Sequence, residues 1–312
     1  MPDLSVCIVN WNTREQLRRC LRSLRDHAEG LELQVIVVDN ASADGSAEMV
    51  RAEFAAREGE GETVGWKVEL IANADNRGYA AGNNQALARA EALQVLLLNP
   101  DIVVKPGALR ALAACAERHP KAGAVAPRLV YPDGRLQASC RSFPTPDIVL
   151  YEALGLSRLF SRSRRFGKYR MTWWDYDDER PVDQPMASAL MLRREALEAM
   201  GDAAVGAAGR GPIAGAFDED FPIFFNDVDL CKRLWDAGWE IWFTPKAEMV
   251  HEHGASTSQV PVRMAVESYR GLVRFYAKHY RGKIGAVGYW GALGLLTLSL
   301  PVRMAKAWMR RR

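Results

Sequence analysis

Three short stretches of this chain carry carboxylate and imidazole groups that could work together in catalysis. They are Asn99–Asp101, Asn226–Asp229 and His251–His253. Carboxylates and imidazoles can hold a divalent metal ion, and an ionised carboxylate can take a proton from a hydroxyl group. Together the three stretches predict a transferase that acts on a diphosphate-linked donor.

Asp101 is the first candidate metal ligand. Its carboxylate, with diphosphate oxygens and water, would give the oxygen-rich ligand set that Mg²⁺ and Mn²⁺ favour. Such a cation would neutralise the charge that develops on a departing nucleoside diphosphate. His251 or His253 could add an imidazole ligand. The alternative is that Pro100 and Asp101 form an ordinary turn and that each histidine is a hydrogen-bonded structural residue.

Asp227 and Asp229 lie at the start of a predicted helix over 230–236. The helix dipole would keep Asp227 ionised, and an ionised carboxylate can act as general base toward a sugar hydroxyl. Asp229 could orient that group or help to cap the helix. The alternative is that both residues only cap the helix.

The elements that must position these residues can be read from an alternation of apolar runs and helical periodicity. This alternation predicts an α/β fold with a parallel sheet and helices on both of its faces. The expected strands cover 6–9, 33–38, 67–71 and 95–98, and the expected helices cover 11–24, 46–57, 82–92 and 106–119, with Thr13 as an N-cap.

Polar residues stand where the expected strands end, at Asn10, Asp39, 73–78 and Asn99–Asp101. In an open α/β sheet, ligands bind in the crevice outside the carboxyl ends of the strands. Asp39 could accept hydrogen bonds from a base or a ribose, and backbone N–H groups of the 73–78 loop could approach a nucleotide. Simple turn formation is the alternative, but four such endings on one edge favour a nucleotide site. Neither GxGxxG nor GxxxxGK(S/T) is present, so a dinucleotide-binding or P-loop protein is not indicated.

Composition limits the class of protein. The 312 residues are 48% hydrophobic and 25% charged, which is the balance of a globular protein with a large core. The net charge of +3 does not indicate a nucleic-acid partner. Because the five cysteines form no CxxC pair and the N-terminus lacks the basic and apolar regions of a secretory signal, we expect a cytoplasmic catalytic part.

The C-terminal part indicates contact with a membrane surface. Residues 284–302 carry no charge and are just long enough to span a bilayer. Four glycines, a proline and flanking basic residues favour a helix that lies on the surface instead, and packing on the domain is the alternative. Basic clusters over 162–170 and 303–312 could meet lipid head groups, although the first could equally be a solvated loop. We expect an irregular insertion near the site over 141–182 and a loop over 203–216.

Taken together, these segments closely resemble the family 2 glycosyltransferases with the GT-A fold, and within them the rhamnosyltransferase-like branch. The resemblance covers residues 4 to 257 in family order. The matching segments are Ser5–Asn12, Val37–Ser46, Asn76–Asn84, Leu97–Asp101, Ser188–Arg194, Asp227–Leu234, Ala237–Trp239 and His251–Ser256.

The resemblance implies a mostly parallel central sheet flanked by helices, in a catalytic domain over 1–258. Residues 1–130 would form its nucleotide-binding half and 131–258 its acceptor-binding half. Beyond the resemblance, the uncharged 284–302 segment and its basic flanks lead us to expect that 259–312 form an apolar, helical, membrane-associating extension.

The resemblance also implies inverting transfer of a sugar from a nucleoside-diphosphate sugar, with dTDP-rhamnose favoured. The acceptor would be a hydroxyl of a glycan or lipid-linked saccharide in cell-surface polysaccharide synthesis, at the cytoplasmic face of the membrane. Asp227 would be the base with Asp229 beside it, and Asp101 and His251 would hold Mg²⁺ or Mn²⁺. Substrate-binding residues would be Asn10, Asn12, Asp39, Asn76, Gly78, Asn83 and Asn99.

Two positions depart from the family pattern. Asn99 stands at the first acid of the DxD-like motif, and Asn226 stands where an acidic residue usually precedes the base. These departures leave open a weaker dependence on metal, an altered pKa of the base, or a nucleotide-sugar-binding module without catalysis. A sugar nucleotidyltransferase is disfavoured because 10–13 is not a glycine-rich basic loop.

Overall fold

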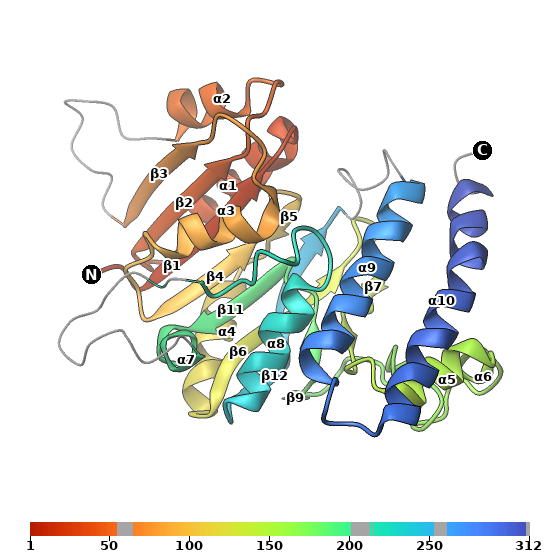
Figure 1. The fold of residues 1–312 in the computed structure, drawn as a ribbon. Coiled ribbons are helices and arrows are strands. Elements are labelled where there is room, and N and C mark those ends of the chain that lie inside the picture. The colour runs from red at the N-terminus through yellow and green to blue at the C-terminus, as the bar shows by residue number, and fades with distance from the viewer. Residues whose placement is uncertain (55–64, 201–212, 214, 253–260, 310–312) are drawn as a thin grey trace.

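The computed structural model of the protein describes residues 1–54, 65–200, 213, 215–252 and 261–309 (Figure 1). Its first third alternates strands and helices, as the sequence predicts, because continuous apolar runs bury on both faces of a parallel sheet. The elements are β1 (Leu4–Asn10), α1 (Arg14–Asp26), β2 (Leu33–Asp39), α2 (Ser46–Glu53), β3 (Trp66–Ala72), α3 (Gly78–Leu87) and β4 (Gln94–Leu98).

The remainder of the chain completes the sheet and adds helices at one end of it. Its strands are β5 (Ile102–Val104), β6 (Ala122–Val130), β7 (Leu136–Gln137), β8 (Cys140–Arg141), β9 (Arg180–Pro181), β10 (Gln184–Pro185), β11 (Ala189–Arg193) and β12 (Glu240–His251). Its helices are α4 (Ala108–Arg118), α5 (Pro146–Ala153), α6 (Leu156–Leu159), α7 (Arg194–Met200), α8 (Asn226–Asp236), α9 (Pro261–His279) and α10 (Ala286–Met309).

The sheet is parallel in one half and mixed in the other. Its order is β3-β2-β1-β4-β11-β6-β12-β5. In addition, β7 pairs with β6, and β9 pairs with β12. The pairs among β3, β2, β1 and β4 are parallel, whereas β11 runs antiparallel to both β4 and β6. Since β6 and β12 are parallel, the carboxyl ends of β1, β2, β4 and β12 share one edge. That edge is where a ligand site is expected.

Two apolar layers sandwich the sheet. On one face α1, α2 and α4 contribute Leu17, Val50 and Leu112 to a buried cluster, and on the other face α3 and α8 contribute Leu87 and Leu230. In Figure 1, α1 and α4 lie behind the sheet, and α3 and α8 lie in front of it. The result is a three-layer α/β/α arrangement that holds the strand ends rigidly.

A third apolar cluster joins the C-terminal helices to the first turn of α8. It contains Val228 of α8, Phe275 and Tyr276 of α9, and Tyr289 and Leu296 of α10. No helix within the described ranges is long and apolar enough to cross a membrane. The helix predicted around 284–302 is therefore α10, and one side of it is packed on the protein.

Some boundaries differ from the prediction. The helix expected over 82–92 begins at Gly78 and ends at Leu87, because the Asn76 side chain accepts a hydrogen bond from the Gly78 N–H and starts the turn early. The 141–182 segment is less irregular than expected, since it contains β8, α5, α6 and β9. The loop predicted over 203–216 lies almost wholly outside the described residues, as does His253.

Candidate active site

A hydrogen-bonded cluster closes the ends of β1 and β2. Asn10 and Asp39 face each other in register, and the Asn10 amide donates to Asp39 Oδ1 at 2.8 Å. The second oxygen, Asp39 Oδ2, accepts from the Ser42 N–H at 3.0 Å. Thr13 does not cap its helix with its side chain, because its hydroxyl donates to Asn10 Oδ1 at 2.6 Å. These bonds fix the Asp39 carboxylate at the sheet edge where the sequence predicts donor binding.

Asn12 shapes the loop beside this cluster. Its backbone has a φ of 53°, a left-handed conformation that asparagine tolerates better than most residues. The Asn12 N–H donates to Ser42 Oγ at 2.9 Å, and its side-chain oxygen accepts from the Ala43 N–H at 2.8 Å. Asn12 thus ties the loop after β1 to the loop after β2.

The 73–78 loop meets the segment that leads to Asp227. Gly78 has a φ of +84°, and a Cβ there would stand 3.2 Å from the Pro222 carbonyl oxygen. The neighbouring Tyr79 N–H donates to the same Pro222 oxygen at 3.3 Å. Asn83, which was also predicted to bind substrate, is buried, and its amide donates to the Tyr79 carbonyl within α3. In this position the Asn83 amide supports the helix.

Asp101 and His251 come together although they are far apart in the sequence. The distance between Asp101 Oδ1 and His251 Nε2 is 3.4 Å, and both side chains are largely buried. His251 Nδ1 lies 2.6 Å from Gln137 Oε1, which fixes the ring. Asn99 Oδ1 and Asp101 Oδ1 are buried and have no hydrogen-bond partner within the described residues. Buried oxygens without partners are costly, and a cation that accepts oxygen and imidazole ligands would satisfy them.

The strand-entry segment Ala187–Ser188 connects the two acidic positions. The Asn99 N–H donates to the Ser188 carbonyl at 2.8 Å, and the Ala187 N–H points to Asp227 Oδ2 at 3.5 Å. Tyr79 donates its hydroxyl to the Ala187 carbonyl at 3.1 Å. Burial raises the pKa of Tyr79, and the negative charges of Asp227 and Asp101 raise it further. The two carboxylates therefore lie around one tyrosine.

Asp227 has the environment of a base that can be protonated and deprotonated. It lies in the first turn of α8, where Asp227 Oδ1 accepts from the Val228 N–H at 2.9 Å. Burial raises the pKa of Asp227, and the backbone hydrogen bonds from Val228 and Ala187 only partly oppose that rise. A carboxylate of raised pKa is a stronger proton acceptor once it is ionised.

Asp229, predicted beside the base, has the opposite environment because its partners are basic side chains. Its side chain is fully buried, and Asp229 Oδ1 lies 2.7 Å from His279 Nε2 and 2.8 Å from Lys278 Nζ. Asp229 Oδ2 lies 2.8 Å from Arg233 Nε. Burial alone would raise the pKa of Asp229, but the His279 hydrogen bond and the two cations outweigh it and hold it at about 2. Asp229 is committed to joining α8 to α9.

The sequence named most of the residues that gather at this edge but not their supports. The supporting roles of Ala187, Tyr79, Gln137 and His279 were not predicted, because each acts through a contact across forty or more residues of sequence. Tyr79 lies within the matching segment Asn76–Asn84, and Ala187 comes just before the matching segment Ser188–Arg194, so their positions could have drawn attention to them.

Comparisons with known proteins identify the family and the fold. The family described as "Glycosyl transferase family 2" matches residues 5–198, more than half of the chain. The N-acetylglucosaminyl-diphospho-decaprenol L-rhamnosyltransferase of Mycobacterium tuberculosis (strain ATCC 25618 / H37Rv) is 29% identical over 322 residues, covering 99% of this chain and 96% of the relative.

Solved structures have a similar fold. The mannosyltransferase PcManGT from Pyrobaculum calidifontis, in complex with GDP-Man and Mn²⁺, is similar with a TM-score of 0.58 and 19% identity, covering 99% of this chain and 73% of that one. GalNAc-T7 with UDP, GalNAc and Mn²⁺ is similar with a TM-score of 0.60 and 12% identity, covering 90% of this chain and 49% of that one. At these identities the likeness concerns the fold.

Proposed function

The chain belongs to glycosyltransferase family 2 and has the GT-A fold, and from that premise we propose that it is an inverting enzyme that transfers a sugar from a nucleoside diphosphate to a lipid-linked saccharide. One observation carries the proposal. Asn99, two residues before Asp101, is hydrogen-bonded to Ser188, and the neighbouring Ala187 N–H points to Asp227, whose pKa is raised. The segment Ala187–Ser188 thus contacts both the proposed leaving-group site and the proposed proton acceptor.

In the proposed reaction Asp227 takes the proton from the acceptor hydroxyl. The hydroxyl oxygen attacks the anomeric carbon as the bond from that carbon to the diphosphate oxygen breaks, so the configuration inverts in one displacement. The transition state has oxocarbenium character, as in glycoside hydrolysis. Ala187 and Val228 hold the Asp227 carboxylate from the backbone, so the base needs little reorganisation when the acceptor arrives.

The Asn99–Asp101–His251 group fits a divalent cation. Asp101 Oδ1 lies 3.4 Å from His251 Nε2, and Asn99 Oδ1, two residues before Asp101, is buried without a hydrogen bond. Mg²⁺ or Mn²⁺ accepts oxygen and imidazole ligands of this kind. A bound cation would supply positive charge to the departing diphosphate. Asp39, with Asn10 behind it, is proposed to bind the nucleoside, while Asn12, Asn76 and Gly78 shape the loops around it.

The substrates are proposed from the relative that matches over its full length. That protein is named as a rhamnosyltransferase acting on N-acetylglucosaminyl-diphospho-decaprenol. We accordingly propose a deoxy-sugar donor of the dTDP-rhamnose type and a polyprenyl-diphosphate-linked saccharide as acceptor. The product would enter cell-surface polysaccharide synthesis.

An enzyme with a lipid-linked acceptor must bind at a membrane surface. The helices that pack around the third apolar cluster offer a face that could do so. Large apolar side chains are exposed on α5, α6 and α10, which contact one another at one end of the molecule (Figure 1). Exposed basic residues follow directly at Arg162, Arg164, Arg165 and Lys168, and such residues attract anionic lipid. The five buried free cysteines fit the cytoplasmic face, where thiols stay reduced.

A panel of nucleotide sugars tests the proposal. Donor turnover and binding would be measured with and without Mn²⁺, on the wild type and on Asp227→Asn. We expect one donor to be turned over selectively with a short lipid-linked acceptor, and the variant to lose about 10²–10⁴-fold in turnover while it still binds the donor. Donor binding with equal acceptor turnover in the variant would exclude Asp227 as the base. Binding with no turnover by the wild type, even with lipid-linked acceptors, would favour a non-catalytic nucleotide-sugar-binding module.

A further inference from the structure

A second cluster of potential ligands lies away from the active site. Cys115 and His119 stand one helical turn apart at the end of α4, and Glu179 comes just before β9. The sulfur, a ring nitrogen and a carboxylate oxygen all lie within 4.8 Å of one another. Within the ranges that the structure describes, no other group of three such side chains converges this closely. The proposed function makes no use of any of the three.

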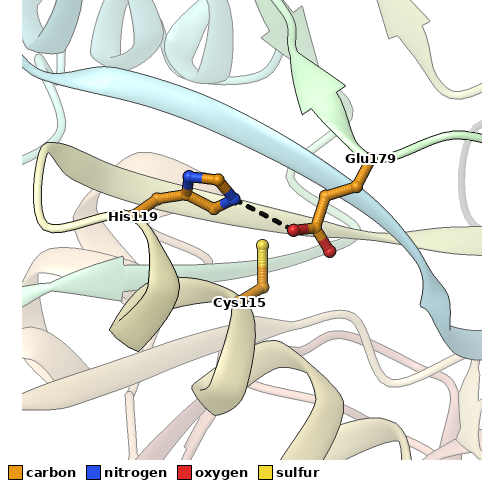
Figure 2. A group of neighbouring side chains, drawn as sticks. All are labelled: Cys115, His119 and Glu179. Atoms are coloured by element: carbon orange, nitrogen blue, oxygen red, sulfur yellow. Dashed lines mark hydrogen bonds and ion pairs between the residues drawn. The ribbon is translucent and has the colours of Figure 1, made fainter.

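The three side chains point at a common centre. Figure 2 shows the Cys115 sulfur directed at the bond between the His119 ring and Glu179. His119 Nε2 and Glu179 Oε1 are 2.9 Å apart. Cys115 is fully buried, while the His119 and Glu179 side chains are 24% and 20% exposed. The centre is therefore closed by protein on the helix side and open to solvent on the other.

Surrounding contacts fix the ligands without using the atoms that face the centre. The His119 ring stacks on Trp242 of β12, with centroids 3.4 Å apart and planes 11° from parallel. Glu179 Oε2 accepts hydrogen bonds from Arg118 and Thr244, both at 2.8 Å. Glu179 Oε1 is thus left toward the centre. Supporting contacts of this kind orient metal ligands in proteins.

We propose that Cys115 Sγ, His119 Nε2 and Glu179 Oε1 bind one thiophilic divalent cation of the Zn²⁺ class, with solvent as the fourth ligand. Thiolate, imidazole and carboxylate are the ligands that Zn²⁺ takes in proteins. On binding, the Cys115 S–H bond breaks and its proton leaves to solvent, while the sulfur electron pair forms the bond to the metal. Thiolate and carboxylate together carry two negative charges, which balance the ion.

This centre differs from the Asp101–His251 position both in place and in ligand type. Trp242 and Thr244 lie near the start of β12, whereas His251 is its last residue, so the two positions are at opposite ends of that strand. The Asp101 position offers oxygen and imidazole ligands, which suit Mg²⁺ and Mn²⁺. Only the α4 centre adds sulfur, so we expect the two positions to select different metals.

The bound ion would have a structural role. It would join the end of α4 to the residue before β9, and β9 is paired to β12 at Trp242 and Phe243. Without metal, Glu179 interacts only with its side-chain partners, which include Arg118 and His119. These contacts are partly exposed to solvent, and such contacts contribute little to stability. Metal binding would convert these contacts into a firm crosslink between the helical layer and the sheet.

Co²⁺ substitution tests the proposal directly, because a thiolate bound to Co²⁺ gives a charge-transfer absorption that oxygen and nitrogen ligands do not. The whole protein, freed of metal with a chelator, would be titrated with Co²⁺ and then with Zn²⁺. We expect one thiolate-bound Co²⁺ per chain, displaced by one equivalent of Zn²⁺, and a higher melting temperature with Zn²⁺. Absence of the thiolate band in the wild type would overturn the proposal.

Matched variants make the assignment specific. Cys115→Ser, and independently the part-exposed His119→Gln, should each weaken the affinity by about a hundredfold or more, since even supporting residues contribute 10–100-fold. Cys140→Ser removes an equally buried thiol, and Asp101→Asn removes the active-site carboxylate; both should keep the band. A band that survives both Cys115→Ser and His119→Gln would place the metal elsewhere. A band lost in Asp101→Asn would mean that the ion occupies the active site.

Discussion

At the scale of single residues, Asp227 and Asp229 show how two carboxylates in one helical turn acquire different tasks. Both side chains are buried, and burial taken alone would raise the pKa of each. Asp227 has only backbone N–H groups to offset this effect, and its pKa stays raised. Asp229 has Arg233, Lys278 and His279, and its pKa falls to about 2. Of the two carboxylates, only Asp227 therefore has a pKa above the ordinary carboxyl value, as a proton acceptor requires.

The raised pKa of Asp227 predicts the acid side of the pH–rate profile. The base must be ionised, so kcat/KM should fall tenfold per pH unit once the pH drops below the Asp227 pKa. Because burial raises that pKa, the fall should begin above the ordinary carboxyl value of about 3.9. Steady-state rates from pH 4 to 8 would test this, with enzyme stability checked at each pH. Rates that stay constant down to pH 4 would contradict the assignment.

The metal position yields a second prediction at this scale. Asp101→Asn keeps the shape of the side chain but removes its charge, so the Mn²⁺ concentration for half-maximal turnover should rise by about tenfold or more. Asn99→Asp should lower it, because it adds a second carboxylate where Asn99 Oδ1 is buried without a partner. Measuring turnover against Mn²⁺ concentration decides both. An unchanged metal response in Asp101→Asn would move the ligand elsewhere.

The sequence could predict residue types at the site better than their orientation. Asn10, Asp39, Asp101 and Asp227 could be proposed from the sequence because strand ends and helix starts lie next to them in the chain. The sequence could not predict that Asn83 is buried with its amide bonded to the Tyr79 carbonyl, since one position on α3 decides which way an amide faces. No local pattern reports such a rotation.

At the scale of elements, the contact between α8 and α9 places helix α8, which carries the proposed base. Asp229 lies on α8, whereas Lys278 and His279 are the last residues of α9. Phe225, just before α8, has a φ of 69° and packs against Phe275 of α9. Helix α9 thus holds the first turn of α8, which carries Asp227. The sequence predicted α8 but not this partner, because the contact joins segments fifty residues apart.

Because protonation of Asp229 would break this contact, we expect the stability of the protein to fall in acid. The pKa of Asp229 is lower in the folded state than in the unfolded chain, so its stabilisation is present above about pH 4 and is lost as the pH falls toward 2. The depression to about 2 corresponds to roughly 2 kcal/mol. Asp229→Asn should therefore lower the free energy of unfolding at pH 7 by at least this amount, and make it less dependent on pH below 4.

Urea unfolding at pH 7 and at pH 3 measures both effects. Asp236→Asn is a matched control on the same helix, because Asp236 pairs with Lys232 at a more exposed position and such pairs contribute little. Equal destabilisation by the two variants would show that the α8–α9 contact has no special importance.

At the scale of the whole molecule, the apolar side chains left exposed are concentrated at one end. Leu154 and Leu159 of the α5–α6 segment are 63% and 73% exposed, and Val287, Trp290 and Leu298 of α10 are 90%, 67% and 76% exposed. The opposite side of α10 is packed, through Tyr289, Ala292 and Leu296. The sequence showed an apolar segment here, but only the packing separates the buried stripe from the exposed one.

This separation decides how membrane association should be tested. Removing α10 altogether would uncover Phe275 and Tyr276 and disturb the helix that holds α8, so loss of binding would be ambiguous. Substituting exposed residues leaves the packed side intact.

Since burying a large apolar side chain contributes about 1.5–3 kcal/mol, Trp290→Ser combined with Leu159→Ser should weaken binding to vesicles that contain anionic lipid by at least about tenfold. The comparison is by sedimentation with vesicles, against Leu93→Ser, a similarly exposed leucine just before β4. Because the substituted side chains touch neither carboxylate of the site, turnover of a water-soluble acceptor should be unchanged, and vesicle binding equal to that of the wild type would show that another surface meets the membrane.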